Sequence, residues 1–312
     1  MMPEEIARDI EERVKRSLEY SEKIYGEIAK EISGKDHILL LTTGWLKSPA
    51  CGTQSALASL LGFSKSVHMD LSFFSRYIAP YHDNPTRDWE DVGLIIYDNP
   101  RDPWRGFFER LVRTLHILGF RGVVLSLGRG ASYAKSLGEG FVVLDIPSGI
   151  DPILTYHIAV IRAILEIAGR EKPMPRIAKL ASEVSDPHSV IPDMVGRYGK
   201  RLEEIMGLIA RETPVFIATC SSRSYAEGLI IDGVSISGLY DISEVSDIAT
   251  LGSPAIVSYV EVERDLIPPS IMSSIISGRS LEIYLKTDPI VSPIYFRILS
   301  MISIAHRSRT VS

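Results

Sequence analysis

The sequence predicts an α/β protein built as two three-layer sandwiches, each with a parallel sheet between helices. Short runs rich in β-branched residues alternate with helical segments of roughly 10 to 17 residues, which is the order that parallel sheets require. These runs are apolar throughout, as expected for strands buried on both faces. The length of 312 residues suits two domains, and 45 % hydrophobic with 23 % charged residues is typical of a globular protein.

A long amphipathic helix is expected at residues 4–32, where Ile6, Ile10, Val14 and Leu18 follow one another every four residues. In the rest of the first half, strands are expected at 38–41, 67–71, 93–97, 122–127 and 141–146, and helices at 48–61, 104–118 and 152–168. In the second half, helices are expected at 194–210, at 225 to about 234, from about 268 and from 292. Strands are expected at 215–219, 238–242, 255–259 and 281–285.

The chain changes character between the two halves. Prolines and charges interrupt the apolar periodicity between about 170 and 192, so we expect a first domain at 1–170 and a second at 171–312 joined there. At an offset of about 178 residues, Tyr20 and Ile24 align with Tyr198 and Leu202, and the first strand falls on the strand at 215–219. This pattern favours an internal duplication. Two unrelated helix–strand units of one α/β domain are the alternative.

Charge and composition exclude several functions. A net charge of −5 gives no electrostatic case for nucleic acid or an anionic membrane. The longest apolar stretch, at 290–305, contains Pro293 and Arg297 and is shorter than the ~20 residues that span a bilayer. Without a signal-peptide pattern, we expect a cytoplasmic protein. Two cysteines are too few for a disulfide scaffold, and the scarcity of Asn and Gln is typical of thermophiles.

Four loops follow expected strands and carry polar residues. In parallel α/β sheets, ligands bind at the carboxyl ends of strands, often on helix N-termini. Hydroxyls, helix-start amides and arginine suit a phosphate, although each of these residues can instead simply cap a helix. The predicted binding residues are Thr43 and Ser48 in the first loop, Asn99 and Arg101 in the second, and Ser221, Ser222 and Arg223 in the last, while the loop at 128–132 contributes glycines and Arg129.

Asp232 is the carboxylate with the most unusual sequence context, since it lies between apolar residues directly after the serine-rich loop. Burial there would raise its pKa and suit a general base. The alternative is that Asp232 faces solvent or caps the end of a helix. No P-loop, intact dinucleotide fingerprint or metal-ligand spacing is present among the seven histidines and two cysteines, so we expect no cofactor and no metal.

Several segments resemble the sugar isomerase (SIS) family, in the double-domain form of archaeal phosphosugar isomerases and of the isomerase half of glutamine:fructose-6-phosphate amidotransferase. The similar segments are residues 37–44, which resemble the first strand and ligand turn, and 67–77, which resemble a strand followed by an S/E-F-R-Y motif. Residues 226–228, 254–257 and 289–294 are similar to A-x-E-G, P-V-I-V and the entry of the final helix. The resemblance implies flavodoxin-like SIS-type sandwiches and a sugar-phosphate ligand. Open sheets flanked by apolar helices such as the one at 152–168 must bury those helices, so we also expect a homodimer.

The family's catalytic pattern is altered. Residues 97–102 replace the hydroxyl-rich S-x-S-G-x-T phosphate loop, Ile231 and Val234 stand at the Lys and Glu positions, and Gly252-Ser253-Pro254 replaces H-G-P. We therefore expect binding of a sugar phosphate or other carbohydrate derivative. If the protein is active, it is an aldose–ketose isomerase in which Asp232 moves a proton between C1 and C2 while Ser221, Ser222 and Arg223 hold the anion. The alternative is a catalytically lapsed SIS protein that senses a sugar derivative or serves as a structural partner.

Overall fold

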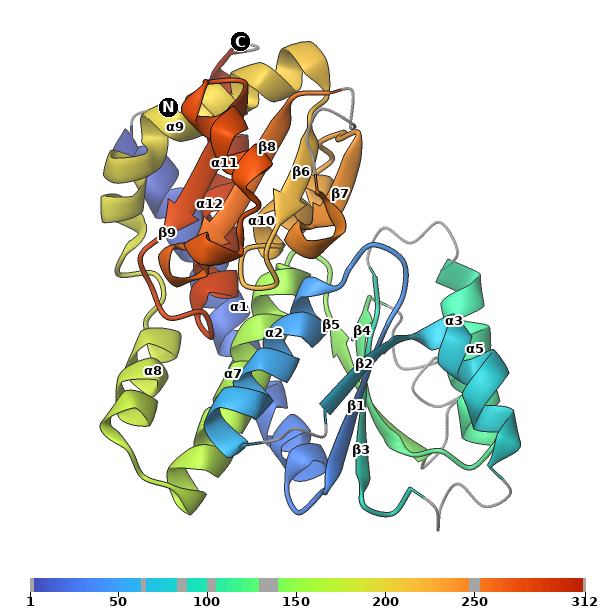
Figure 1. The fold of residues 1–312 in the computed structure, drawn as a ribbon. Coiled ribbons are helices and arrows are strands. Elements are labelled where there is room, and N and C mark those ends of the chain that lie inside the picture. The colour runs from blue at the N-terminus through green and yellow to red at the C-terminus, as the bar shows by residue number, and fades with distance from the viewer. Residues whose placement is uncertain are drawn as a thin grey trace. The chain divides into compact units, whose positions relative to one another are not determined.

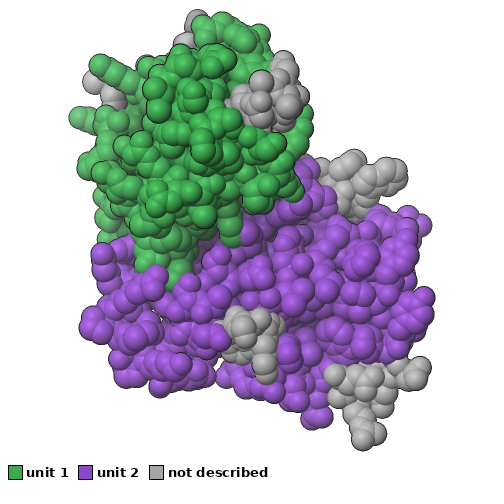
Figure 2. Space-filling model, in the orientation of Figure 1, with its two compact units in different colours: residues 1–15, 186–312 green, residues 16–185 purple. Residues whose placement is uncertain are grey.

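The computed structural model describes residues 3–62, 66–82, 89–99, 105–128, 140–246 and 253–310 (Figure 1). The chain forms two compact units, one of residues 16–185 and one of residues 1–15 and 186–312 (Figure 2). The first helix, α1 (Pro3–Ile32), begins in the second of these units and ends in the first. Each unit is an α/β sandwich around a parallel sheet, which confirms the predicted fold class.

Unit 16–185 contains a five-stranded sheet in the order β2-β1-β3-β4-β5. All strand pairs are parallel, and β1 lies between β2 and β3 and pairs with both. Continuous apolar runs form these strands because both faces of the sheet are covered. The strands are β1 (His37–Thr42), β2 (Ser66–Asp70), β3 (Val92–Tyr97), β4 (Gly122–Leu127) and β5 (Phe141–Ile146).

Helices cover both faces of this sheet. On one side in Figure 1 lie α3 (Leu71–Phe73) and α5 (Arg105–Ile117); on the other lie α2 (Ser48–Ala56) and α7 (Pro152–Glu171). The α2 helix continues as a π-helical turn, η1 (Leu57–Leu61), and α3 continues through η2 (Phe74–Ile78) and η3 (Ala79–Tyr81). The core on the α5 side joins alternate strand residues with the apolar faces of the helices, including Leu39, Leu41, Leu94, Ile96, Phe108, Val112, Leu115 and Val124.

The apolar helix α7 is a core helix of this unit. Within the described ranges it is the one helix with the length and composition to cross a membrane, and most of it is buried inside the protein. Its N-terminus is capped by the Asp151 carboxylate, which accepts the amide of Leu154 at 2.8 Å. Helix α8 (Pro175–Ser185) packs beside it.

Unit 1–15 and 186–312 contains a four-stranded parallel sheet in the order β7-β6-β8-β9. Helix α11 packs on the face that holds Val215, Ile217 and Val257. Helix α10 packs on the other face, where Tyr225 contacts Phe216, and α12 packs on α10 and α9. The elements are α9 (Ile191–Glu212), β6 (Val215–Ala218), α10 (Ser224–Ile231), β7 (Gly238–Asp241), η5 (Ile242–Glu244), β8 (Ala255–Val260), η7 (Glu261–Leu266), α11 (Pro269–Ile276), β9 (Ser280–Leu285) and α12 (Ser292–Thr310).

The proline-rich stretch at 170–192 carries a helix that apolar periodicity did not predict. Pro175 is the first residue of α8, where its fixed φ is favourable and its missing N–H costs nothing. The helix buries Ile177, Leu180 and Val184, one side chain per turn. Prolines on both sides therefore delimit a helix here rather than preventing one.

Helix α10 approaches α12 closely at Gly228. A Cβ at this position would lie 2.3 Å from Ser300 Oγ and 2.7 Å from Arg297 Nη1. Both side chains are fully buried, and Arg297 Nη1 also donates to Ser300 Oγ at 2.6 Å. The contact between these helices therefore requires a residue without a side chain.

We expect Gly228→Ala to lower the free energy of unfolding by about 1–3 kcal/mol, because buried Ser300 and Arg297 have to shift to admit the methyl group. Urea denaturation followed by circular dichroism measures the change. The matched control is Gly207→Ala in α9, where an added Cβ meets no atom within 4 Å and higher helix propensity favours a gain of up to ~1 kcal/mol. Equal stability of Gly228→Ala and wild type would contradict the close packing.

Candidate functional site

Each sheet has one point at which the strand order reverses direction. In the orders β2-β1-β3-β4-β5 and β7-β6-β8-β9, these points lie between β1 and β3 and between β6 and β8. Connections leave the two central strands toward opposite sides there, and in open α/β sheets a ligand crevice is expected at the carboxyl ends of such strands. We call these points the β1/β3 crevice and the β6/β8 crevice, and each is the place in its unit where the strand order predicts a ligand.

The β1/β3 crevice brings together two predicted residues, Thr43 and Asn99. The Asn99 amide donates to the Thr43 carbonyl at 3.2 Å. Gly44, between β1 and α2, has φ +61°, and a Cβ there would lie 3.3 Å from Asn99 Nδ2, so the turn needs glycine. The Thr43 side chain is 6 % exposed, and its hydroxyl has no hydrogen-bond partner among the residues that the structure describes. A buried hydroxyl without a partner is costly, and a ligand atom would satisfy it.

Ser48 begins helix α2, and Lys47 occupies the cap position without a side-chain cap. The Ser48 hydroxyl lies 3.3 Å from His157 Nε2, and both side chains are buried. Burial lowers the pKa of His157 to about 3, opposed by the Asp151 carboxylate. The imidazole is therefore neutral at physiological pH.

On the β3 side of the β1/β3 crevice, buried polar groups form hydrogen bonds within the protein. Asp98 is fully buried, and its carboxylate accepts the amide of Leu127 from the neighbouring strand β4 at 3.3 Å. The Tyr156 hydroxyl donates to the carbonyls of Asp98 and Leu125 at 3.2 and 2.9 Å. These bonds tie β3, β4 and α7 together and direct the negative charge of Asp98 toward β4. Arg101, the other residue predicted in this loop, lies outside the described residues.

The β6/β8 crevice contains the serine-rich turn predicted from the sequence. Ser222 joins the two strands, because its hydroxyl donates to the Ser258 carbonyl at 2.6 Å and accepts the Thr219 amide at 3.1 Å. Ser221 donates instead to the carboxylate of Glu263 at 2.5 Å. Sequence reasoning missed Glu263. It follows β8 by three residues, so the rule that neighbouring strand ends share an edge could have identified it.

Arg223 lies beside this turn but is engaged within its own helix. Its Nε donates to Glu227 Oε1 at 2.8 Å, one helical turn further on, and the two side chains are 7 % and 0 % exposed. A buried ion pair of this kind resists separation, since either charge alone would be desolvated without compensation. Neither cysteine of the chain is a free thiol, so Cys220 in the same turn offers no nucleophile.

Asp232 lies at the opposite end of α10 from the serine-rich turn. It follows Arg223 by nine positions along the chain, which is about 13 Å along a helix. Its carboxylate accepts a bond from Arg297 Nη1 at 2.8 Å and lies 3.8 Å from Arg13 Nη2. Arg297 is fully buried and Asp232 is 16 % exposed. Asp232 thus neutralises the charge that α12 buries, and the structure does not bring it together with Ser221, Ser222 and Arg223.

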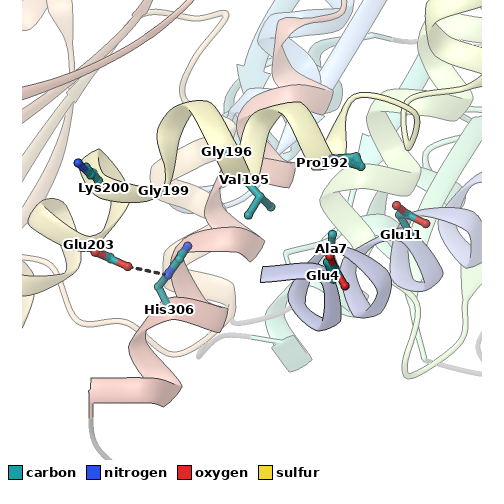
Figure 3. Close-up of a pocket in the computed structure, with 10 residues that line it drawn as sticks. All are labelled: Glu4, Ala7, Glu11, Pro192, Val195, Gly196, Gly199, Lys200, Glu203 and His306. Atoms are coloured by element: carbon teal, nitrogen blue, oxygen red, sulfur yellow. Dashed lines mark ion pairs between the residues drawn. The ribbon is translucent and has the colours of Figure 1, made fainter. Parts of the chain in front are cut away.

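A cavity of about 540 Å³ lies among α1, α9 and α12 (Figure 3). Three glutamates line it, and Glu203 forms an ion pair with His306 at 3.3 Å. This acidic lining disfavours a phosphate, and no predicted site residue is part of it. Within the described part of the chain, no group of three or more His, Cys, Asp or Glu side chains could hold a metal ion. The full lining is Glu4, Ala7, Glu11, Pro192, Val195, Gly196, Gly199, Lys200, Glu203 and His306.

Comparisons with known proteins found similar folds among solved structures. No protein-family model matches the chain, and no curated protein matches it either. The C-terminal domain of glucosamine-fructose-6-phosphate aminotransferase from Francisella tularensis is 11 % identical over 97 % of this chain and 94 % of that chain, with a TM-score of 0.64.

Two further solved structures are similar over nearly their whole length. A phosphosugar isomerase candidate from Silicibacter pomeroyi is 14 % identical over 98 % of both chains, with a TM-score of 0.63. Tagatose-6-phosphate ketose/aldose isomerase from Escherichia coli is 11 % identical over 99 % of this chain and 93 % of that chain, with a TM-score of 0.54. At such low identity the likeness shows the fold alone, which is the SIS-type, flavodoxin-like α/β fold expected from the sequence.

The buried neutral His157 generates a prediction about pH. An unfolded chain binds a proton at this imidazole with a pKa near 6.5, whereas the folded chain resists protonation until about pH 3. The free energy of unfolding is therefore unaffected by this titration well above pH 6.5. It decreases as the pH falls from 6.5 toward 3, because over that range only the unfolded chain takes up the proton. Between pH 7 and 5 the loss is about 2 kcal/mol.

The His157→Gln variant has no such titration, so its free energy of unfolding should fall less between pH 7 and 5 than that of wild type. Urea denaturation at several pH values measures both profiles. The control is Thr114→Val on the exposed face of α5, which should keep the wild-type profile because it changes no titratable group. Parallel profiles for His157→Gln and wild type would contradict a neutral buried imidazole.

Proposed function

We propose that this protein binds a sugar phosphate or a related carbohydrate derivative in the β1/β3 crevice. The observation that carries the proposal is the buried Thr43 hydroxyl, which has no partner within the described residues and lies where the strand order reverses. Sugars present many hydroxyls that both donate and accept hydrogen bonds. An unsatisfied threonine hydroxyl beside the Asn99 amide suits such a ligand.

The start of helix α2 supplies a suitable place for the phosphate. Lys47 at the N-cap makes no side-chain cap bond, and no acidic residue lies in the first turn. The helix dipole therefore favours an anion there. The Asp98 carboxylate is bonded toward β4, so we place the anion on the β1 side of the crevice, near Thr43 and Ser48.

The names of the similar structures agree with this ligand class. The enzymes from Francisella tularensis and Escherichia coli are named for fructose-6-phosphate and tagatose-6-phosphate, both ketose phosphates. The similarity in fold supports testing ketose phosphates as ligands of this chain.

The strand orders support a finer proposal about domain organisation. Both sheets contain the order second–first–third–fourth strand, and each first strand follows a long helix, α1 or α9. We propose that the chain is a double-SIS protein with domains at 1–170 and 171–312, joined near 170–192, and that it acts as a homodimer in the cytoplasm.

Isomerisation is the finer proposal for activity. An aldose–ketose isomerase needs a base that moves a proton between C1 and C2, and Asp232 is the base predicted from the sequence. Asp232 belongs to the unit that does not contain the β1/β3 crevice, and it forms an ion pair with buried Arg297. Both facts favour the alternative, a protein that binds a sugar derivative without turnover. Asp232 would be acting as a structural counter-ion in that case.

Ligand binding is tested by thermal shift with a panel of hexose and amino-sugar phosphates. A ligand that binds the folded protein raises Tm, and the shift grows with its concentration. We expect Thr43→Val to weaken binding of the responding ligand at least tenfold, since it removes one hydrogen bond. Without ligand, the variant should be as stable as wild type or more stable, because the lost hydroxyl has no partner among the described residues.

The matched control is Thr114→Val on the exposed face of α5, which should leave the shift unchanged. No shift with any panel member would overturn the proposal. So would an undiminished shift in Thr43→Val.

Activity is tested by converting aldose and ketose phosphates with wild type and Asp232→Asn. If Asp232 is the base, turnover falls at least a hundredfold in the variant while the thermal shift with ligand persists. Turnover that survives the substitution would exclude Asp232 as the base. Removal of this charge also leaves Arg297 buried with less compensation, so we expect a stability loss on the order of 3 kcal/mol in either case.

A further inference from the structure

We propose that the β6/β8 crevice is a second anion site, which the protein keeps closed with its own Glu263 carboxylate. Its ligand would be a small molecule that carries a phosphate or carboxylate group and displaces Glu263. This site is separate from the β1/β3 crevice of the proposed function, and it does not depend on that function.

Three donors converge on the Glu263 carboxylate. The Thr219 hydroxyl donates to Oε2 at 2.6 Å, the Ser221 hydroxyl donates to Oε1 at 2.5 Å, and the Val260 amide donates to Oε2 at 3.0 Å. The two hydroxyl bonds have the short lengths of charge-assisted hydrogen bonds, whereas the amide bond has an ordinary length. In the described ranges no lysine or arginine pairs with Glu263, so hydroxyls and one amide alone hold the negative charge. The same donors match the oxygens of a bound phosphate or carboxylate.

The donors are fixed independently of Glu263. Thr219 and Ser221 are 3 % and 4 % exposed at the end of β6. Ser222 accepts the Thr219 amide and donates to the Ser258 carbonyl, which connects β6 to β8. The Ser292 hydroxyl donates to the Ser221 carbonyl at 2.9 Å. These bonds would remain if Glu263 left, so the crevice would keep its shape.

Glu263 itself sits on a loosely packed segment. All six residues of η7 are described and none is buried. Val262 and Leu266 are 72 % and 63 % exposed, and Glu263 is half-buried. A segment with few buried contacts opens at low free-energy cost. The carboxylate can therefore leave without disturbing the core, while its donors stay in place.

Helix capping explains only part of this arrangement. Glu263 is the third residue of η7, and its bond from the Val260 amide is an ordinary capping interaction. The two hydroxyls come from the neighbouring strand end and add nothing to a cap. They are placed for an anion at the point where parallel sheets bind ligands. The internal carboxylate thus lowers the apparent affinity of an external anion by the fraction of molecules that are closed.

Inorganic phosphate is the probe, and isothermal titration calorimetry at constant ionic strength is the measurement. We expect Glu263→Ala to bind phosphate at least tenfold more tightly than wild type. The control is Glu261→Ala, on the same segment, whose carboxylate pairs with Lys286 at 2.8 Å and makes no bond to the crevice; it should bind as wild type does. Adding Ser221→Ala to Glu263→Ala should abolish the gain.

The inference is overturned if folded Glu263→Ala binds phosphate no better than wild type, or if its gain survives Ser221→Ala. Should Glu263→Ala fail to fold, Glu263→Gln decides: its amide oxygen can still accept the Val260 amide, but the neutral group competes less with phosphate. It should show a smaller gain with the same dependence on Ser221. Thr43→Val should leave either gain unchanged, which separates this result from failure of the β1/β3 site.

Discussion

The third strand of each sheet pairs with the first rather than the second, and both candidate sites exist because of that constraint. Parallel strands bring their carboxyl ends to one edge, and the reversal of strand order opens that edge between β1 and β3 and between β6 and β8. Helices cover the sheet faces, which leaves the strand-end loops as the place where polar side chains can meet a ligand. The polar residues of both crevices follow from this geometry.

Compensation of buried charge governs much of the remaining polar structure. Arg297 is neutralised by Asp232, and Arg223 by Glu227. His157 is neutral because burial lowers its pKa. An uncompensated charge in these positions would cost several kcal/mol, so the two described charged side chains that were expected to act on a ligand, Arg223 and Asp232, are each paired with a neighbour. This is why Arg223 and Asp232, adjacent in sequence to a plausible anion loop, have structural partners instead.

The two crevices differ in what satisfies their hydroxyls. At β1/β3, Thr43 lacks a partner within the described residues, and the nearby Asn99 amide holds the turn. At β6/β8, a carboxylate from the neighbouring strand end satisfies Ser221 and Thr219. The same fold therefore presents one crevice with an unsatisfied hydroxyl and one that contains its own anion, which is a physical basis for giving the two units different roles.

Local patterns by themselves determined the α/β class, most element boundaries and the loops at the carboxyl edge. The apolar run at 122–127 coincides with β4 because a strand that is buried on both faces has mostly apolar residues. Helix α8 was not predicted, because prolines and charges around it interrupt its short amphipathic pattern. Only the tertiary structure decided the order of the strands and the partners of Ser221 and Asp232. Those partners, Glu263 and Arg297, are 42 and 65 residues away along the chain, and local periodicity carries no information about pairing over such separations.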